Sequence, residues 1–248
     1  MEIIAKKIEE LITENYVYAS VLYHFGIKFY DYSDQTLLQI CEERGLDANK
    51  LIKNLEQVAT RKDQALAWTN YPIDLILEYL RHTHFIFVKR KLPYMATLID
   101  ALESEHICEK YMVNDLKLLF PLFVDDFIQH IHEEEDTFFK YISLLLEANQ
   151  KPNLMGKLLY EMEQNSIQKF ALHHHNHDDE MRGIRELTHN YFLPSHSSLH
   201  FKVVYEELKA LEKELKLHAQ IEDEILFVKA MQLETEVLGK FKKFAQLN

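Results

Sequence analysis

The sequence predicts an all-α fold, with an up-down-up-down four-helix bundle preceded by a small helical domain. Glycine and proline number only five each in 248 residues, so the residues that usually interrupt helices are scarce. Four long segments repeat apolar residues every three or four positions, which is the period of an amphipathic helix. Because short polar breaks join these segments, neighbouring helices are expected to run antiparallel.

The small helical domain is predicted for residues 1–60. The phrase "EIIAKKIEELI" places apolar residues at helical spacing. A second helix is expected in "SDQTLLQICEERGL", with Ser33 as a candidate N-terminal cap and Gly45 at its end. A third is expected to begin at Asp47, in "DANKLIKNLEQVA". The weakly periodic residues 61–72 form the predicted linker.

The four-helix bundle is predicted for residues 73–248. Pro93 is expected to bend the first helix, because an internal proline removes a backbone hydrogen bond and clashes with the preceding turn. Pro121 lies near the start of the second helix or at a kink in it. The four helices are expected at 73–103, 114–148, 153–189 and 199–234.

The composition argues against several classes of partner and site. The formal net charge is −12 and no Lys/Arg-rich tract occurs, so neither nucleic acid nor a membrane surface is expected as a partner. No run approaches the ~20 apolar residues that span a bilayer. Cys41 and Cys108 lack Cys-x-x-Cys spacing, which argues against a disulfide framework or a thiolate metal site. The N-terminus contains no apolar signal core, and a cytoplasmic location is expected.

One acidic phrase with a histidine at its head occurs twice. "HIHEEEDTFF" begins at His130 and "HAQIEDEILF" begins at His218. Each phrase reads His-x-x-x-Glu and closes with Phe nine positions after the histidine. Residues four apart are neighbours on one helical face, so His130 and Glu134 project together, as do His218 and Glu222. Both glutamates fall in the middle of an apolar stripe, and both are therefore expected to point inward.

Inward glutamates need a counter-charge. A buried carboxylate without a compensating partner costs several kcal/mol, and two that face each other also repel. No Arg or Lys lies beside Glu134 or Glu222 on these stripes, so a metal is the natural choice. His84 on the first helix and His177 on the third lie in register with apolar residues as well. Four imidazoles and two carboxylates suit two first-row ions that share bridging carboxylates.

Simpler interpretations of these residues stay open. A single His-x-x-x-Glu is usually an exposed pair on a helix surface, but two copies with matching flanks on apolar faces argue against it. His82 competes with His84 as the ligand of the first helix. His132 is expected at the surface, and the histidines at 173–175 are expected in a solvated turn. Four acidic residues are either solvated or hold a ligating imidazole by its second nitrogen: Glu135, Asp136, Asp223 and Glu224.

These motifs resemble the hemerythrin-like di-iron proteins, and within them the repair-of-iron-centres branch. The resemblance covers residues 70–235, through "HTHFIFVKRKLPYM", "HIHEEEDTFF", "HHNHDDEM" and "HAQIEDEILF". It implies two iron ions with an oxo or hydroxo bridge, with Zn or Mn as substitutes. In that branch the bridging ligands correspond to Glu134 and Glu222. The terminal ligands correspond to His84, His130, His177 and His218.

The N-terminal residues are similar to the small helical domain that precedes the bundle in the same branch. There the family places an adjacent Cys-Cys pair, whereas residues 29–33 of this chain read "FYDYS" and contain no thiol. A thiol-dependent role is therefore not expected of this module. Packing, homodimer formation and docking of a partner stay open as its uses.

Three functions follow as hypotheses, and no catalytic residue is assigned. The first is a non-haem di-iron protein that donates iron to damaged iron–sulfur centres, or reacts with NO or O2, under nitrosative or oxidative stress. The second is a sensor or carrier that binds O2 or NO without turnover. The third is a bundle in which metal only stabilises the fold. Expected partners are a diatomic ligand and iron–sulfur proteins, and whether the protein is an enzyme stays open.

Overall fold

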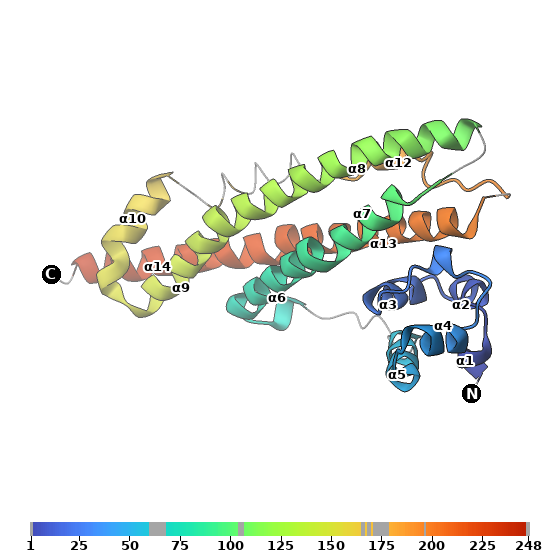
Figure 1. Ribbon diagram of the computed structural model, residues 1–248. Coiled ribbons are helices and arrows are strands. Elements are labelled where there is room, and N and C mark those ends of the chain that lie inside the picture. Colours follow the sequence, from blue (N-terminus) through green and yellow to red (C-terminus); the bar gives the residue numbers. More distant parts are fainter. Residues whose placement is uncertain are drawn as a thin grey trace. The chain divides into compact units, whose positions relative to one another are not determined.

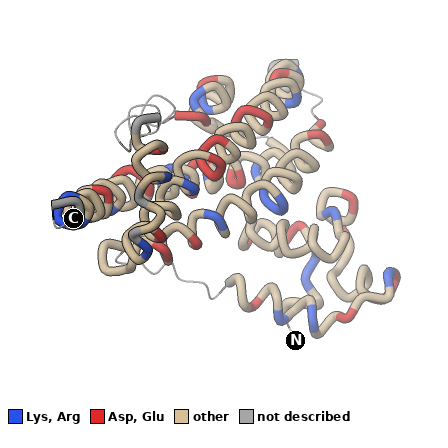
Figure 2. The backbone as a smooth tube through the Cα atoms, turned by 90° about the vertical axis from the view of Figure 1, so that its left-hand side faces the viewer, with Lys and Arg blue, Asp and Glu red and all other residues tan. Residues whose placement is uncertain are grey.

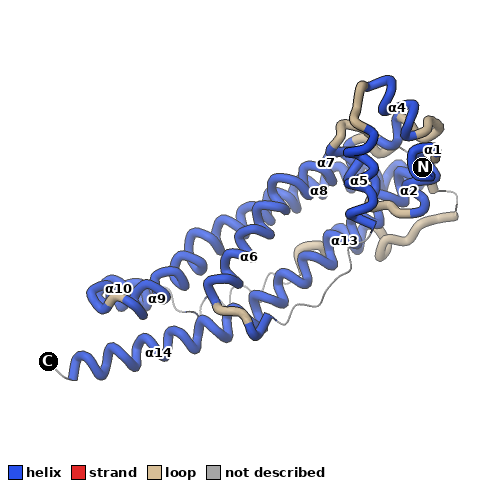
Figure 3. The backbone as a smooth tube through the Cα atoms, turned by 90° about the horizontal axis from the view of Figure 1, so that it is seen from below, coloured by secondary structure: helices blue, strands red, loops and turns tan. Residues whose placement is uncertain are grey.

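The structure is a computed structural model, and it describes residues 2–59, 68–103, 107–164, 167, 170, 179–195 and 197–246 (Figure 1). Within these residues every regular element is a helix or a helical turn, and no strand occurs (Figure 3). An isolated antiparallel bridge joins Lys7 to Thr36. The predicted all-α class is confirmed.

The chain forms two compact units, each assembled from three separate segments. Unit 1 comprises Met1–Ala65, Leu92–Leu118 and Ile184–Glu212. Unit 2 comprises Leu66–Lys91, Leu119–Gly183 and Lys213–Asn248. The division drawn on the sequence, with a domain at 1–60, a linker at 61–72 and a bundle at 73–248, stays a prediction.

Short helices form the N-terminal part of unit 1. They are α1 (Glu2–Ala5), α2 (Ile8–Glu14), α3 (Tyr18–His24), the 3-10 turn η1 (Phe29–Asp31), α4 (Leu37–Arg44) and α5 (Ala48–Ala59). Thr36 caps α4, not the predicted Ser33: its hydroxyl accepts the N–H of Gln39 at 3.3 Å, and the Gln39 side chain accepts the N–H of Thr36 at 2.8 Å. As predicted, α4 ends at Gly45, whose φ of 64° lies in the left-handed region. Asp47 accepts two backbone N–H groups at the start of α5.

Long helices supply the rest of both units. After the 3-10 turn η2 (Trp68–Asn70) come α6 (Ile73–Ile86), η3 (Phe87–Lys91) and α7 (Leu92–Asp100). Next come α8 (Ile107–Glu133), η4 (Glu134–Phe139) and α9 (Lys140–Gln150). Then follow η5 (Pro152–Leu154), α10 (Met155–Gln164) and α12 (Arg182–Leu187). The chain closes with α13 (Leu199–Ile221), η7 (Glu222–Leu226) and α14 (Phe227–Gln246).

Three of the turns inside these long segments are π-helical: η3, η4 and η7. The turn η3 immediately precedes Leu92 and Pro93, where a bend was predicted. A π turn adds one residue to the helical repeat and is a recognised way to interrupt the regular hydrogen-bond ladder, which Pro93 cannot join. Pro121, by contrast, lies inside α8. None of the described helices has the length and apolar character needed to cross a membrane.

The core of unit 2 lies between α6, η4–α9 and η7–α14. Phe138 and Phe227 stack with their ring centroids 4.4 Å apart, which joins the two π-turn segments. Burial of each large apolar side chain contributes about 1.5–3 kcal/mol. The buried residues include Ile76, Leu77, Leu80, Phe139, Ile142, Leu145, Leu226, Ala230 and Val237. Acidic residues are distributed along the helices and interleaved with basic ones (Figure 2).

Within unit 1, the thiol-free residues of the N-terminal module pack on a histidine. The rings of Tyr30 and His200 stack at 4.3 Å and 5°, and Phe29 meets His200 edge-on at 5.6 Å. His200 Nε2 donates a hydrogen bond to the carbonyl of Leu98 at 3.0 Å. Burial lowers the pKa of His200 to about 4, although the Leu98 carbonyl and the carboxylate of Asp31 oppose the shift.

His200 is therefore predicted to make stability depend on acid pH. Its pKa in the unfolded chain is about 6.5, so the unfolded state takes up the proton first as pH falls. Its contribution is complete above pH 6.5 and is lost as pH falls towards 4, by about 2 kcal/mol. The free energy of unfolding in urea should therefore fall by about this much less for His200→Phe than for the wild type when the pH is lowered from 7 to 4.5. Parallel pH dependences of the two proteins would contradict the assignment.

Candidate metal centre

The two acidic phrases adopt the same backbone conformation. His130 lies at the end of α8 and Glu134 opens the π turn η4; His218 lies at the end of α13 and Glu222 opens η7. In a straight α-helix nine residues make two and a half turns, so the closing Phe of each phrase would lie opposite its histidine. The extra residue of the π turn brings Phe139 and Phe227 into the core instead.

Four side chains of unit 2 converge in its interior. They are His84, Glu134, His218 and Glu222, and each offers one donor atom within 4.8 Å of the others. All four are buried, with exposed fractions of 2, 7, 6 and 1%. Polar side chains from three separate helical segments therefore meet at one place inside an otherwise apolar core.

The imidazoles of His84 and His218 lie at the centre of this group. Their Nε2 atoms are 2.9 Å apart, so one N–H points at the lone pair of the other ring. Glu134 Oε2 lies 3.4 Å from His84 Nε2, and Glu222 Oε1 lies 3.2 Å from His218 Nε2. Aromatic rings enclose both imidazoles: Phe139 stacks on His84 at 5.5 Å and Phe87 meets His218 edge-on at 5.8 Å.

The second nitrogen of His84 is held by the residue that follows Glu134. His84 Nδ1 lies 2.9 Å from Glu135 Oε1, so the two nitrogens of one ring face two consecutive glutamates. Of the alternatives that the sequence left open for Glu135, the structure shows the contact with an imidazole. Asp136 instead pairs with Lys140 at 2.7 Å, on the surface.

The carboxylates control the charge of His84. Burial acts to lower its pKa, but Glu134, Glu222 and Glu135 together outweigh burial and raise the pKa above its ordinary value. These carboxylates therefore favour the form of His84 that carries a second proton and a positive charge. Because metal ligands must be deprotonated, metal binding would displace that proton.

The donor set fits a transition-metal ion. Imidazole nitrogen and carboxylate oxygen are the ligands that first-row ions prefer in such sites. Ligands about 2.1 Å from a common ion lie roughly 3.0–3.4 Å from each other. Three of the separations fall close to that range: 2.9 Å for His84–His218, 3.4 Å for His84–Glu134 and 3.2 Å for His218–Glu222. This buried group could hold a metal.

The other predicted ligands are placed as follows. His130 lies outside the group of four, with a partly exposed side chain, but its Nε2 is 3.2 Å from Glu134 Oε1. His82 is exposed, so in the first helix His84 faces the group. His132 is exposed as expected. His177 and the histidines at 173–175 lie outside the described residues.

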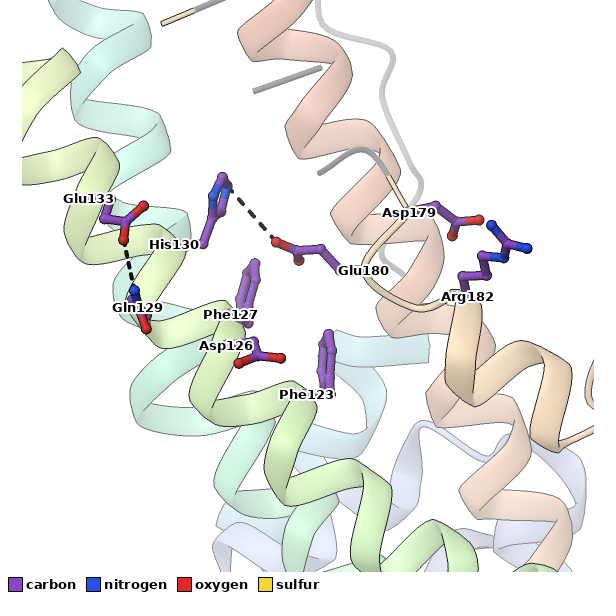
Figure 4. Close-up of a pocket in the computed structure, with 9 residues that line it drawn as sticks. All are labelled: Phe123, Asp126, Phe127, Gln129, His130, Glu133, Asp179, Glu180 and Arg182. Atoms are coloured by element: carbon purple, nitrogen blue, oxygen red, sulfur yellow. Dashed lines mark hydrogen bonds and ion pairs between the residues drawn. The ribbon is translucent and has the colours of Figure 1, made fainter. Parts of the chain in front are cut away.

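Two features of the site were not predicted. Glu180 lies in the turn before α12, with its Oε1 4.0 Å from His130 Nε2 (Figure 4). It closes the phrase "HHNHDDE", in which only the histidine was considered. The π turns were missed too, although the repeated His-to-Phe spacing of nine, which does not suit an α-helix, was a signal for them.

Comparison with known proteins found curated relatives, whereas no family model matches the chain. The chain is 22% identical over 207 residues to the iron–sulfur cluster repair protein YtfE of Pectobacterium carotovorum subsp. carotovorum, covering 81% of this chain and 85% of the relative. It is 18% identical over 222 residues to the repair protein ScdA of Staphylococcus haemolyticus, covering 90% and 96%. For ScdA of Staphylococcus epidermidis the figures are 19% over 228 residues, again 90% and 96%.

The chain is a homologue of these iron–sulfur cluster repair proteins. The resemblance to iron–sulfur cluster repair proteins, read from the acidic phrases, is therefore confirmed. The matches extend over most of each chain, so the similarity is not confined to the phrases themselves.

Glu135 is predicted to strengthen metal binding by orienting His84. Loss of an outer partner of a ligating histidine lowers metal affinity by about 10–100-fold. Glu135→Gln should therefore weaken Co²⁺ binding by about 10-fold or more, measured by competition with a chelator. Asp136→Asn, which removes the same charge from the same turn without touching His84, should bind like the wild type. Equal affinities for Glu135→Gln and Asp136→Asn would rule out this role.

Proposed function

We propose that this protein is a non-haem di-iron protein of a four-helix bundle. In this proposal it supplies iron to damaged iron–sulfur centres, or reacts with NO or O2, under nitrosative or oxidative stress. The names of its homologues support the repair role, since both YtfE and ScdA are iron–sulfur cluster repair proteins. The arrangement of the buried carboxylates supports the metal pair.

The single observation that favours two ions over one is the position of Glu134. Its Oε2 faces His84 at 3.4 Å and its Oε1 faces His130 at 3.2 Å. The two oxygens of one carboxylate thus lie near imidazoles on two different helices. A bridging carboxylate needs this arrangement, because each of its oxygens binds a different ion. A carboxylate shared in this way also offsets charge between two close cations.

In this proposal the ligands of the pair are His84, His130, Glu134, His177, His218 and Glu222. Bound iron would supply electron exchange with diatomic ligands and iron for release. The protein supplies the rest. His84 and Glu222 are almost completely buried, so this side of the site excludes water, while Glu135 keeps the ring of His84 oriented.

Metal analysis tests the proposal directly. Protein expressed in iron-rich medium should contain about two irons per chain, because a bridged pair needs two cations. Inductively coupled plasma mass spectrometry measures this iron content. Glu222→Gln should lower this to one iron or fewer. Glu224→Gln is the matched control, because Glu224 is exposed and bonded to Gln220 at 3.1 Å. A single tightly held zinc that survives Glu134→Gln would refute the di-iron proposal.

A second candidate function, binding of a diatomic ligand without turnover, is favoured by a cavity beside His218. The cavity has a volume of about 220 Å³ and is lined mainly by apolar groups, among them Tyr79, Ile86, Phe87 and Leu217. The lining also includes Glu214 and His82, but most of the exposed wall is apolar, so a small uncharged molecule could approach the imidazole of His218 through it.

Stopped-flow mixing of the ferrous protein with NO separates the two functions. If the protein reacts chemically, N2O should accumulate, because two electrons from the ferrous pair and two protons convert two NO to N2O and water. Consumption of NO over several turnovers should then require an added chemical reductant. If it only binds NO, one spectral change of fixed amplitude should appear and reverse when NO is removed. Leu217→Trp, which narrows the apolar cavity, should slow either process when the ligand enters beside His218.

A further inference from the structure

The ligands of the proposed metal pair differ in their exposure. The side chains of His84 and Glu222 are each 2% exposed, whereas His130 is 22% exposed. His130 borders a cavity of about 700 Å³ in unit 2, between α8 and the turn that leads into α12 (Figure 4). An ion held at the His130 end would therefore be reachable from solvent.

Glu180 faces His130 across this cavity. Its Oε1 lies 4.0 Å from His130 Nε2, and its side chain is exposed to the same extent, 22%. Figure 4 shows the Glu180 side chain extended towards the imidazole, while Asp179 lies farther from His130, near Arg182. Two acidic residues of one turn thus differ in their relation to the histidine.

The position of Glu180 is fixed by its neighbours in the chain. Met181 is almost completely buried and anchors the turn in the core. The N–H of Arg182 donates to the carbonyl of Asp179 at 3.0 Å, which closes the turn just before α12 begins. Glu180 therefore projects from a constrained backbone, and only its own rotamers need to change for its carboxylate to move.

We propose that Glu180 is an additional metal ligand, which together with His130 and Glu134 holds the ion at the open end of the site. This inference rests on the proposed metal pair. His130 Nε2 lies between the two carboxylates, at 3.2 Å from Glu134 and 4.0 Å from Glu180. Among the described residues, one imidazole and two carboxylates thus face this ion, and these donors suit Fe²⁺ or Mn²⁺.

The separation of 4.0 Å between Glu180 and His130 indicates that Glu180 would be a weakly held ligand. It exceeds a hydrogen-bond length, and it is slightly longer than the distance between two ligands of one ion, so a small rotation of the side chain must accompany binding. Because Glu180 is partly exposed, water can replace it at a modest cost. The ion at the open end is thus exchangeable, while the buried end retains its ion.

Titration of the metal-free protein with Co²⁺ tests this ligand through its visible absorption bands. The wild type should bind two equivalents. Glu180→Gln should bind the first with wild-type affinity and the second about 10-fold or more weakly, with altered absorption for the second ion alone. Asp179→Asn removes an equal charge from the same turn and should match the wild type. Circular dichroism confirms that each variant is folded.

The outcomes separate this inference from the proposed function. If the wild type takes up two equivalents and Glu180→Gln matches it in affinity and spectrum, Glu180 is not a ligand, although the metal pair stands. If the wild type binds only one equivalent, the metal pair itself is refuted, and this inference fails with it. Equal weakening by Asp179→Asn and Glu180→Gln would show a general charge effect and would also overturn the assignment.

Discussion

The burial of two carboxylates beside two imidazoles is the constraint on which unit 2 depends. Glu134 and Glu222 lie in an apolar core, where an uncompensated negative charge would oppose folding by several kcal/mol. The carboxylates raise the pKa of His84 and so favour its positively charged form, which acts against this charge. A bound metal ion would also offset this negative charge. Folding of this unit and occupation of the group are therefore thermodynamically linked, since any ligand that binds only the folded state stabilises it.

The π turns η4 and η7 reconcile this polar group with the core. Each turn begins at a buried glutamate and ends near an aromatic or aliphatic residue that packs in the interior. By adding a residue at this point, the chain can direct Glu134 and Glu135 at the two nitrogens of His84 and still return Phe139 to the apolar side. Each π turn interrupts the regular backbone hydrogen bonds of the α-helix. The residues before and after the turn can therefore serve the polar site and the apolar core separately.

Local periodicity explains what the sequence could predict. The all-α class and the two His-x-x-x-Glu pairs rest on four-residue spacing, which holds on any helix. Helical spacing from Glu222 would bring Ile225 into the core, whereas Leu226 is the fully buried residue, because a π turn rotates the chain after Glu222. Glu180 was missed since a turn has no period to read. Thr36 caps α4 in place of Ser33, and its backbone also forms a bridge to Lys7, a contact distant in sequence that local spacing does not reveal.

The N-terminal module shows how a departure from a family pattern changes a functional expectation. Where the resemblance places an adjacent cysteine pair, Phe29 and Tyr30 pack against His200, so this stretch has a structural use that a pair of thiols would not provide. Residues 1–60 contain one cysteine, Cys41, which is buried, and burial raises the pKa of its thiol. A thiol of that kind is a poor nucleophile and has no neighbour in the module with which to form a disulfide. A role for this module as a thiol-based electron relay is therefore not expected.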